Sequence, residues 1–116
     1  MTDKKQKFIV TDKGFKQGRV TFHKDLNTYN DKVIGGGSWY WDRDRDNLYL
    51  YGASHDFGSV SEEDINRWME DIQVRYFKNS GVIFESDEYK SLFDILVENG
   101  RTPTEANEMI SKNDFI

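Results

Sequence analysis

The chain has 116 residues, 15% of them aromatic, which is enough for one domain with a single core and too short for two ordinary domains. Its formal net charge of −5 argues against non-specific binding to nucleic acid, which requires a basic surface to neutralise phosphates. The sequence has no cysteine, which excludes disulfides, thiolate nucleophiles and cysteine-based zinc sites.

The N-terminal residues "MTDKKQKF" lack the apolar centre of a secretory signal, and no apolar run is long enough to cross a bilayer. We therefore expect a cytoplasmic protein whose partners include neither membrane nor nucleic acid. A phosphorylated or basic protein is the kind of partner that the composition favours.

Two strands are expected at residues 7–10 and 19–23, where β-branched and aromatic residues cluster, with a glycine-containing turn between them. The three glycines 35–37 predict a bend or bulge at which the chain closely approaches another segment. The runs "SWYW" and "NLYLYG" flank "DRDRD" and predict a hairpin with a charged, solvated tip. Their aromatic residues fall on both faces, which is typical of a strand covered on two sides.

After Gly58 the apolar period changes to that of a helix. Ser59 is the predicted N-cap and Glu62 its capping-box partner. The segment "NSG" is expected to end this helix, and a strand follows at residues 82–85. The predicted buried face of the helix consists of Ile65, Trp68, Met69, Ile72 and Tyr76.

Two helices are expected near the end of the chain. The first contains Tyr89, Leu92, Phe93 and Leu96 and closes at Gly100 in the C′ position. The second has Thr102 as its N-cap, Pro103 at its first position and Glu105 as the capping-box partner, and ends near Lys112.

This order of elements predicts a single α+β domain over residues 1–116, with helices packed on a mixed or antiparallel sheet. We expect the apolar residues of the last two helices to pack as core.

No metal site or cofactor is predicted. Asp42, Asp44 and Asp46 alternate as in a calcium loop, but Asn47 stands where the loop needs glycine and Ala53 where it needs glutamate. Two histidines are too few for a zinc site without well-placed carboxylates.

The two histidines are candidates for acid–base chemistry because imidazole titrates near neutral pH. His23 is expected to close the second strand. His55 stands between Ser54 and Asp56, but three adjacent residues cannot all point at one reacting atom, so this string is not a catalytic triad.

Several motifs together resemble the Janus/Ocnus family of small phosphohistidine phosphatases. Lys7 in "KFIV" matches the lysine at the start of that family's first strand, and His23 in "TFHKDLNTYNDKV" resembles the segment with its catalytic histidine. The triple glycine matches as well. The run "LYLYGASHDFG" is similar to the family's "YG-x-S-x-x-Y-G" strand and loop, with Phe57 in place of the usual tyrosine.

The interval from Gly37 to Ser54 equals that of the family, and "INRWMEDIQVRYFKNSGVIFE" is similar to the helix and strand that follow. The resemblance covers about residues 7–85 and implies a Janus phosphatase-like fold. It leaves residues 86–116 as a helical C-terminal extension.

The resemblance implies a metal-independent phosphatase in which His23 is the general base toward an attacking water. Lys7 would supply positive charge, and the loop from Gly52 to Gly58 would hold the phosphoryl oxygens. Within that loop the implied donors are the amides around Gly52, Ala53, Ser54 and His55, together with the Ser54 hydroxyl, and His55 is a candidate acid.

Two alternatives to an enzyme remain open on the sequence. Ser38 replaces the family's phosphate-binding arginine, and only eleven residues separate His23 from Gly35. Both departures weaken the transfer of function, and the loss of the arginine favours a non-catalytic module that binds an anion or phospho-ligand. The second alternative is a protein-interaction module, such as an inhibitor, that uses its acidic surface and helical extension.

Overall fold

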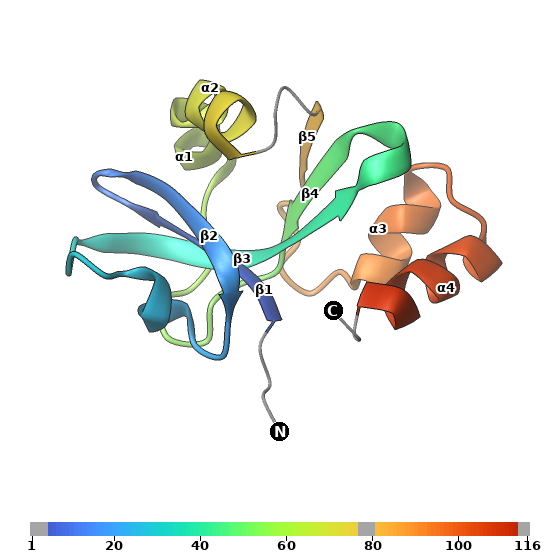
Figure 1. Ribbon diagram of the computed structural model, residues 1–116, viewed down its shortest axis with the longest axis horizontal. Coiled ribbons are helices and arrows are strands. Elements are labelled where there is room, and N and C mark those ends of the chain that lie inside the picture. The colour runs from blue at the N-terminus through green and yellow to red at the C-terminus, as the bar shows by residue number, and fades with distance from the viewer. Residues whose placement is uncertain (1–4, 77–80, 114–116) are drawn as a thin grey trace.

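The computed structural model describes residues 5–76 and 81–113. Five strands form one mixed sheet in the order β2-β1-β3-β4-β5 (Figure 1). The first four strands pair antiparallel, and β5 runs parallel to β4. With its helices the sheet confirms the predicted α+β class. The strands are β1 (Lys5–Thr11), β2 (Gly14–Val20), β3 (Val33–Asp42), β4 (Asn47–Tyr51) and β5 (Gly81–Phe84).

The second strand begins five residues earlier than predicted, because the chain turns within 11–14. The Thr11 hydroxyl accepts a bond of 3.0 Å from the Lys13 amide, and Gly14 has a φ of +136°. Only this first glycine therefore belongs to the turn, and Gly18 lies in β2 opposite Lys7.

The prediction that His23 closes a strand is wrong. His23 instead begins the 3-10 helix η1 (His23–Leu26). The Asp25 carboxylate accepts a bond from the Phe22 amide at 3.3 Å, and this local contact competes with strand pairing.

The glycines 35–37 lie inside β3 and not at a bend, while the predicted alternative, a bulge, fits the shift in register between Val10 and Thr11 beside Gly35. The predicted close approach is confirmed. A Cβ atom on Gly35, Gly36 or Gly37 would lie 2.3, 2.6 or 2.5 Å from a backbone carbonyl oxygen, so only glycine fits there. The pairing of β3 with β1 is irregular just before the glycines, where Ile34 has no partner in the register.

The first α-helix begins later than predicted. Helix α1 (Glu62–Arg67) has Ser61 rather than Ser59 as its N-cap, and the Ser61 hydroxyl accepts a bond of 3.2 Å from the Asp64 amide. The backbone of Ser59 lies against Gly35 of β3, which keeps it outside the helix. Helix α2 (Met69–Asp71) and the π-turn η3 (Ile72–Tyr76) follow. Gly81, the last residue of "NSG", begins β5, while the other two residues of that segment and the side chain of Tyr76 lie outside the described residues.

The last two helices follow their predicted signals closely. Helix α3 (Leu92–Glu98) begins after Ser91, which excludes Tyr89 from the helix, and Gly100 after it has a φ of +105° as expected. Helix α4 (Pro103–Asn113) has the predicted capping box. The Thr102 amide donates to Glu105 at 2.9 Å, and the Glu105 amide donates to the Thr102 hydroxyl at 3.1 Å.

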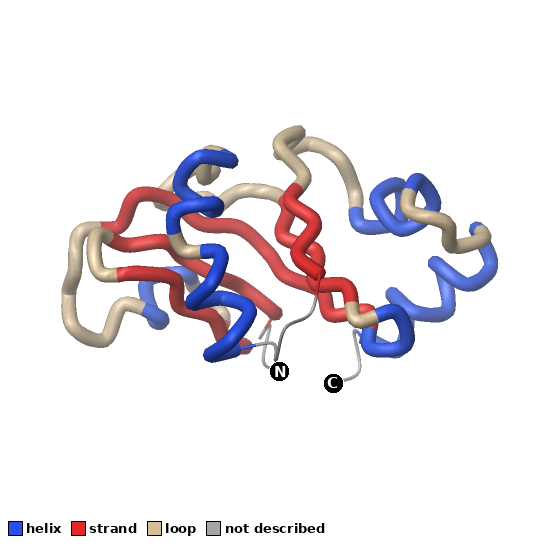
Figure 2. The backbone as a smooth tube through the Cα atoms, turned by 90° about the horizontal axis from the view of Figure 1, so that it is seen from above, coloured by secondary structure: helices blue, strands red, loops and turns tan. Residues whose placement is uncertain are grey.

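Helices cover both faces of the sheet, which therefore has two cores. On one face α1 and η3 bury Ile65 and Ile72 against β1, β3 and β4. On the other face α3 and α4 bury Leu96 and Ala106 against Tyr40 and Tyr49, which confirms that the extension packs as core. Figure 2 shows α3 and α4 together at one end of the sheet.

The second face is covered at both ends and open between them. At one end η1 lies on the sheet, where a Cβ on Gly36 would be 3.1 Å from the His23 ring. At the other end lie α3 and α4. Between these coverings Lys7, Ser38 and Tyr51 pair across β1, β3 and β4 and form an open strip.

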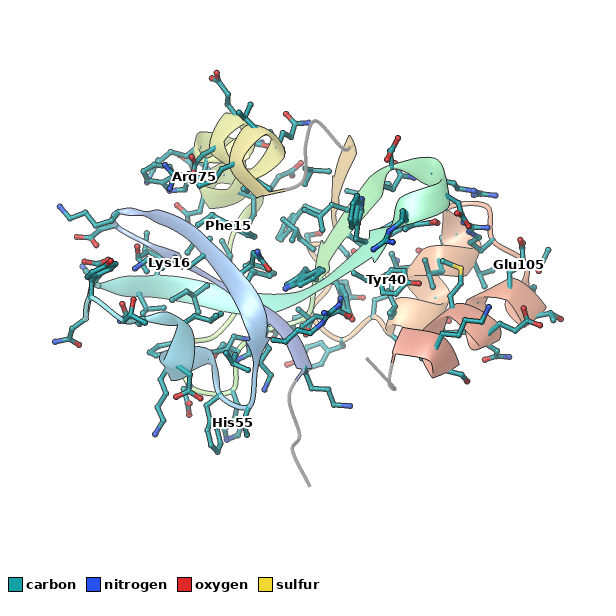
Figure 3. The ribbon with its side chains drawn as sticks, in the orientation of Figure 1. Phe15, Lys16, Tyr40, His55, Arg75 and Glu105 are labelled. Atoms are coloured by element: carbon teal, nitrogen blue, oxygen red, sulfur yellow. The ribbon has the colours of Figure 1, made fainter. Side chains whose placement is uncertain are left out.

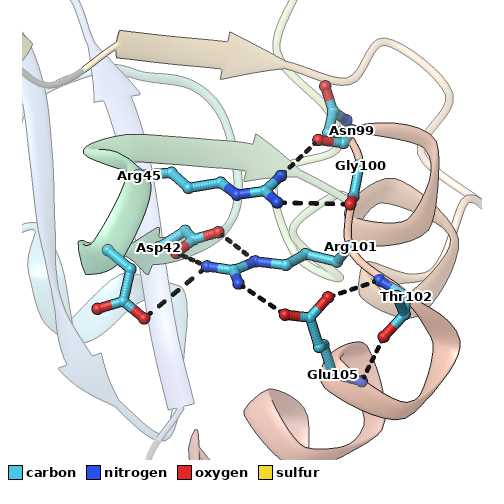
Figure 4. A network of polar contacts seen from close by, with 8 residues as sticks. Asp42, Arg45, Asn99, Gly100, Arg101, Thr102 and Glu105 are labelled. Carbon is cyan, nitrogen blue, oxygen red and sulfur yellow. Dashed lines mark hydrogen bonds and ion pairs between the residues drawn. The ribbon is translucent and has the colours of Figure 1, made fainter.

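The charged hairpin tip is only partly solvated, which corrects the expectation for "DRDRD". The Asp44 side chain is 89% exposed, but the Asp42 side chain is only 1% exposed. Arg101 forks onto Asp42 with bonds of 2.6 and 3.0 Å, and Arg45 donates to the carbonyls of Asn99 and Gly100 (Figure 4). The tip is therefore fastened to the loop between α3 and α4.

In the described part of the chain, none of the helices combines the length and apolar content needed to cross a membrane.

Candidate functional site

A cavity of about 540 Å³ opens at the η1 end of the open strip. Its walls come from β1, η1, β3 and the loop after β4, which are distant in the sequence. Four of the predicted site residues meet there: Lys7, His23, Ala53 and His55. The full lining consists of Lys7, Thr21, Phe22, His23, Lys24, Ser38, Ala53, His55 and Asp56.

His23 is fixed in one orientation by the sheet beneath it. Its side chain is buried, and its Nε2 lies 2.8 Å from the carbonyl oxygen of Gly37. A carbonyl only accepts hydrogen bonds, so Nε2 carries the proton and donates it. The other ring nitrogen, Nδ1, then holds the lone pair that a general base needs.

The environment of His23 favours the neutral ring. Burial lowers the pKa of the imidazole, chiefly because the charged form loses its hydration. The bond to Gly37 opposes this shift, while the charge of Lys7 lowers the pKa further and Asp56 raises it. The net effect is a pKa below 6.5, so His23 is a free base at neutral pH.

Two lysines bring positive charge to the cavity. The Lys7 ammonium donates to the carbonyl of Thr21, which also lines the cavity, and this bond fixes the side chain there. The Lys24 ammonium lies 5.3 Å from the ring centroid of Phe22. With Asp56 as the one acidic residue in the lining, the cavity carries net positive charge in an acidic protein.

The loop after β4 contributes its backbone, but not in the way predicted for Ser54. Ser54 is buried, its amide donates to the carbonyls of Gly36 and Gly58 at 3.1 Å, and its hydroxyl accepts a bond from the Phe57 amide. The amide is therefore used to close the loop and fasten it to β3, and the hydroxyl belongs to a buried side chain outside the cavity lining. This corrects the assignment of Ser54 to the anion site.

The neighbouring amides remain available. Within the described ranges, the amides of Ala53 and His55 have no hydrogen-bond partner. Gly52, with a φ of +74°, lies beside the cavity and is not part of its lining. Figure 3 shows His55 on the side of the sheet where η1 lies, away from α1.

The sequence did not single out Lys24 or Asp56 as site residues. Lys24 lies just past the strand predicted at residues 19–23, and side chains of adjacent residues in extended chain point in opposite directions. The 3-10 turn brings both onto the same cavity. Ser38 was noted only as the residue that replaces an arginine, and its place in the lining follows from its pairing with Lys7.

Among residues 5–76 and 81–113, no group of three or more histidine, aspartate or glutamate side chains is arranged to hold a metal ion. The aspartates of the hairpin tip serve a different purpose, since Asp42 pairs with Arg101.

No protein-family model matches this sequence, and no curated protein matches it either. The resemblance to the Janus/Ocnus family therefore stays a prediction from the motifs.

Proposed function

We propose that the cavity at His23 binds a phosphoryl group and hydrolyses it, as in a metal-independent phosphohistidine phosphatase. The observation that carries the proposal is that a buried neutral histidine, two lysines and two backbone amides with no hydrogen-bond partner among the described residues all belong to one cavity. Its volume of about 540 Å³ is in the range of small-molecule sites.

In the proposed reaction Nδ1 of His23 takes a proton from a water molecule as its oxygen forms a bond to phosphorus. The bond from phosphorus to the leaving nitrogen breaks, that nitrogen takes up a proton from the solvent as its group departs, and Nδ1 then releases its proton to the solvent. Lys7, Lys24 and the amides of Ala53 and His55 would stabilise the charge on the phosphoryl oxygens. The Nε2 bond to Gly37 keeps the ring in the tautomer that this role requires.

A second candidate is a module that binds a phospho-ligand without turnover. Ser38 stands where the resemblance leads us to expect an arginine, and a neutral donor binds an oxyanion less strongly than a charged one. The Ser54 amide is engaged within its own loop, and the Ser54 side chain is buried outside the cavity lining, so neither donor reaches the site. In both candidates the predicted partner is a phosphorylated protein, and a cytoplasmic location stays a prediction from the sequence.

The test is the rate of hydrolysis of a phosphohistidine peptide and of an aryl phosphate by the intact protein and by His23→Gln. Glutamine can retain a bond to the Gly37 carbonyl but cannot take up the proton. We expect the rate to fall by about 10²–10⁴, the usual contribution of a general base.

Lys7→Met is expected to weaken substrate binding, and Lys13→Met is its matched control, since it removes the same charge from the exposed turn between β1 and β2. Equal rates of hydrolysis for the intact protein and His23→Gln would contradict the proposal that the protein is a phosphatase. Binding of phosphopeptide without turnover, weakened by Lys7→Met, would select the second candidate.

A further inference from the structure

A second cavity continues the open strip toward the helical extension. Its volume is about 280 Å³, and it shares Lys7 and Ser38 with the cavity at His23. It lies toward the Lys5 end of β1 and the Trp39 end of β3, so the two cavities follow one another along these strands. Together they form a groove whose two halves differ in character.

The far half of the groove is apolar. Its wall includes the half-buried side chains of Tyr51, Leu92 and Ile110, which come from β4, α3 and α4. Leu92 and Ile110 belong to the helical extension, which packs on the sheet through Tyr40 and Tyr49. The extension thus places an apolar wall beside the cavity that holds His23.

The charges along the groove select an anionic occupant. Lys5, Lys7 and Lys24 line the two cavities, and Asp56 is the acidic residue among the lining residues. This surplus of positive charge lies in a protein whose net charge is −5. An anionic group at the His23 end would be attracted there, while the far end offers apolar contact.

We propose that the groove binds a phosphorylated peptide in an extended conformation, and that Tyr51, Leu92 and Ile110 select an apolar residue beside the phosphorylated one. The part of this inference that concerns the phosphorylated residue rests on the proposed function, and the part that concerns the apolar residue does not. Two residues of extended chain span about 7 Å, which is also the span from Lys7 to Lys5 along β1. The apolar side chain is therefore expected within two residues of the phosphorylated position.

The groove is suited to a chain because its two cavities adjoin at Lys7 and Ser38 and together extend beyond the size of a phosphoryl group. A lone phosphate ion would fill only the His23 end and would leave the apolar wall hydrated. The apolar half adds affinity only for a ligand that also carries an apolar group.

The test measures dissociation constants by fluorescence anisotropy for four peptides. Each carries either a non-hydrolysable phosphonate side chain or its unmodified counterpart, flanked within two residues on both sides by either leucine or serine. We expect the phosphonate peptide with leucine to bind about tenfold more tightly than the one with serine, as burial of one apolar side chain allows.

Ile110→Thr should abolish the preference for leucine. Met109→Thr is the matched control, because Met109 is the neighbouring residue of α4 and packs on the same core but lines a different cavity. This control separates a change in the groove from a general loss of stability, and the four-peptide comparison on the unaltered protein does not depend on either variant folding.

Equal binding of the leucine and serine phosphonate peptides would overturn the inference, as would an equal loss of preference in both variants. If the peptides with leucine bind more tightly but the phosphonate adds nothing to their affinity, the apolar subsite is supported. The same result would contradict the proposed function, because the cavity at His23 would then not bind the anionic group.

Discussion

The imidazole of His23 is a buried base, so its protonation is linked to folding. Its pKa in the folded protein lies below 6.5, the value of an unperturbed histidine, because burial disfavours the charged ring. Below pH 6.5 the unfolded chain therefore binds a proton that the folded protein does not. The free energy of unfolding must fall as the pH drops through this window.

We predict that the intact protein loses stability between pH 7 and pH 5 more steeply than His23→Gln does. The slope from one proton can reach about 1.4 kcal/mol per pH unit. Urea unfolding at several pH values measures it. Glu85 and Glu105, whose pKa values lie below 4.5, contribute their own losses only at lower pH. Parallel slopes for the two proteins above pH 5 would contradict the linkage.

The β3–β4 hairpin and the loop between α3 and α4 are joined by one buried ion pair. The Arg101 side chain is 11% exposed and forks onto Asp42, with a further bond to Glu105 at 3.2 Å (Figure 4). The pairing with Asp42 raises the pKa of Arg101 above its usual value, so the guanidinium stays charged. Removing one partner leaves the other charge buried, which is costly.

We predict that Asp42→Ala lowers the free energy of unfolding by about 3 kcal/mol. Asp44→Ala is the matched control, because Asp44 is 89% exposed and lies 3.9 Å from the same guanidinium. It should cost less than about 1 kcal/mol. Chemical denaturation of both variants measures the difference, and similar costs would show that burial of the pair does not matter.

At the scale of the whole molecule, the extension is part of the core. Leu96 and Ala106 are fully buried, and they cover Tyr40 and Tyr49 at the centre of the sheet. A chain that ends at residue 86 would expose these aromatic residues to water. The two helices are therefore expected to fold together with the sheet.

We predict that deleting residues 87–116 abolishes cooperative unfolding and leads to aggregation, as measured by circular dichroism and size-exclusion chromatography. In the full-length protein, Leu96→Ala should cost about 2–5 kcal/mol. Asn107→Ala, on the exposed side of α4, should cost less than about 1 kcal/mol. A stable, folded truncated chain would instead favour a docking role for the extension.

The sequence alone determined most of the elements and their order. Local signals were sufficient where the decisive contacts lie within a few residues, as in the capping box of Thr102 and Glu105 and the positive φ of Gly100. The aromatic residues on both faces of β3 and β4 likewise predicted strands covered on two sides. Lys7 and His23 were also identified from motifs, and they do share a cavity.

Tertiary structure decided what depends on contacts distant in the sequence. The positions of the triple glycine need residues without a Cβ because backbone carbonyls of three other segments lie close to them. Those segments are distant in the sequence, so the local sequence cannot predict that these glycines stay inside a strand. Asp42 is buried because Arg101, fifty-nine residues away, neutralises it. Ser54 turns inward because its loop closes onto Gly36, while the extension places Leu92 and Ile110 beside the groove. In each case the outcome depends on which segments pack together, and only the folded chain brings those segments into contact.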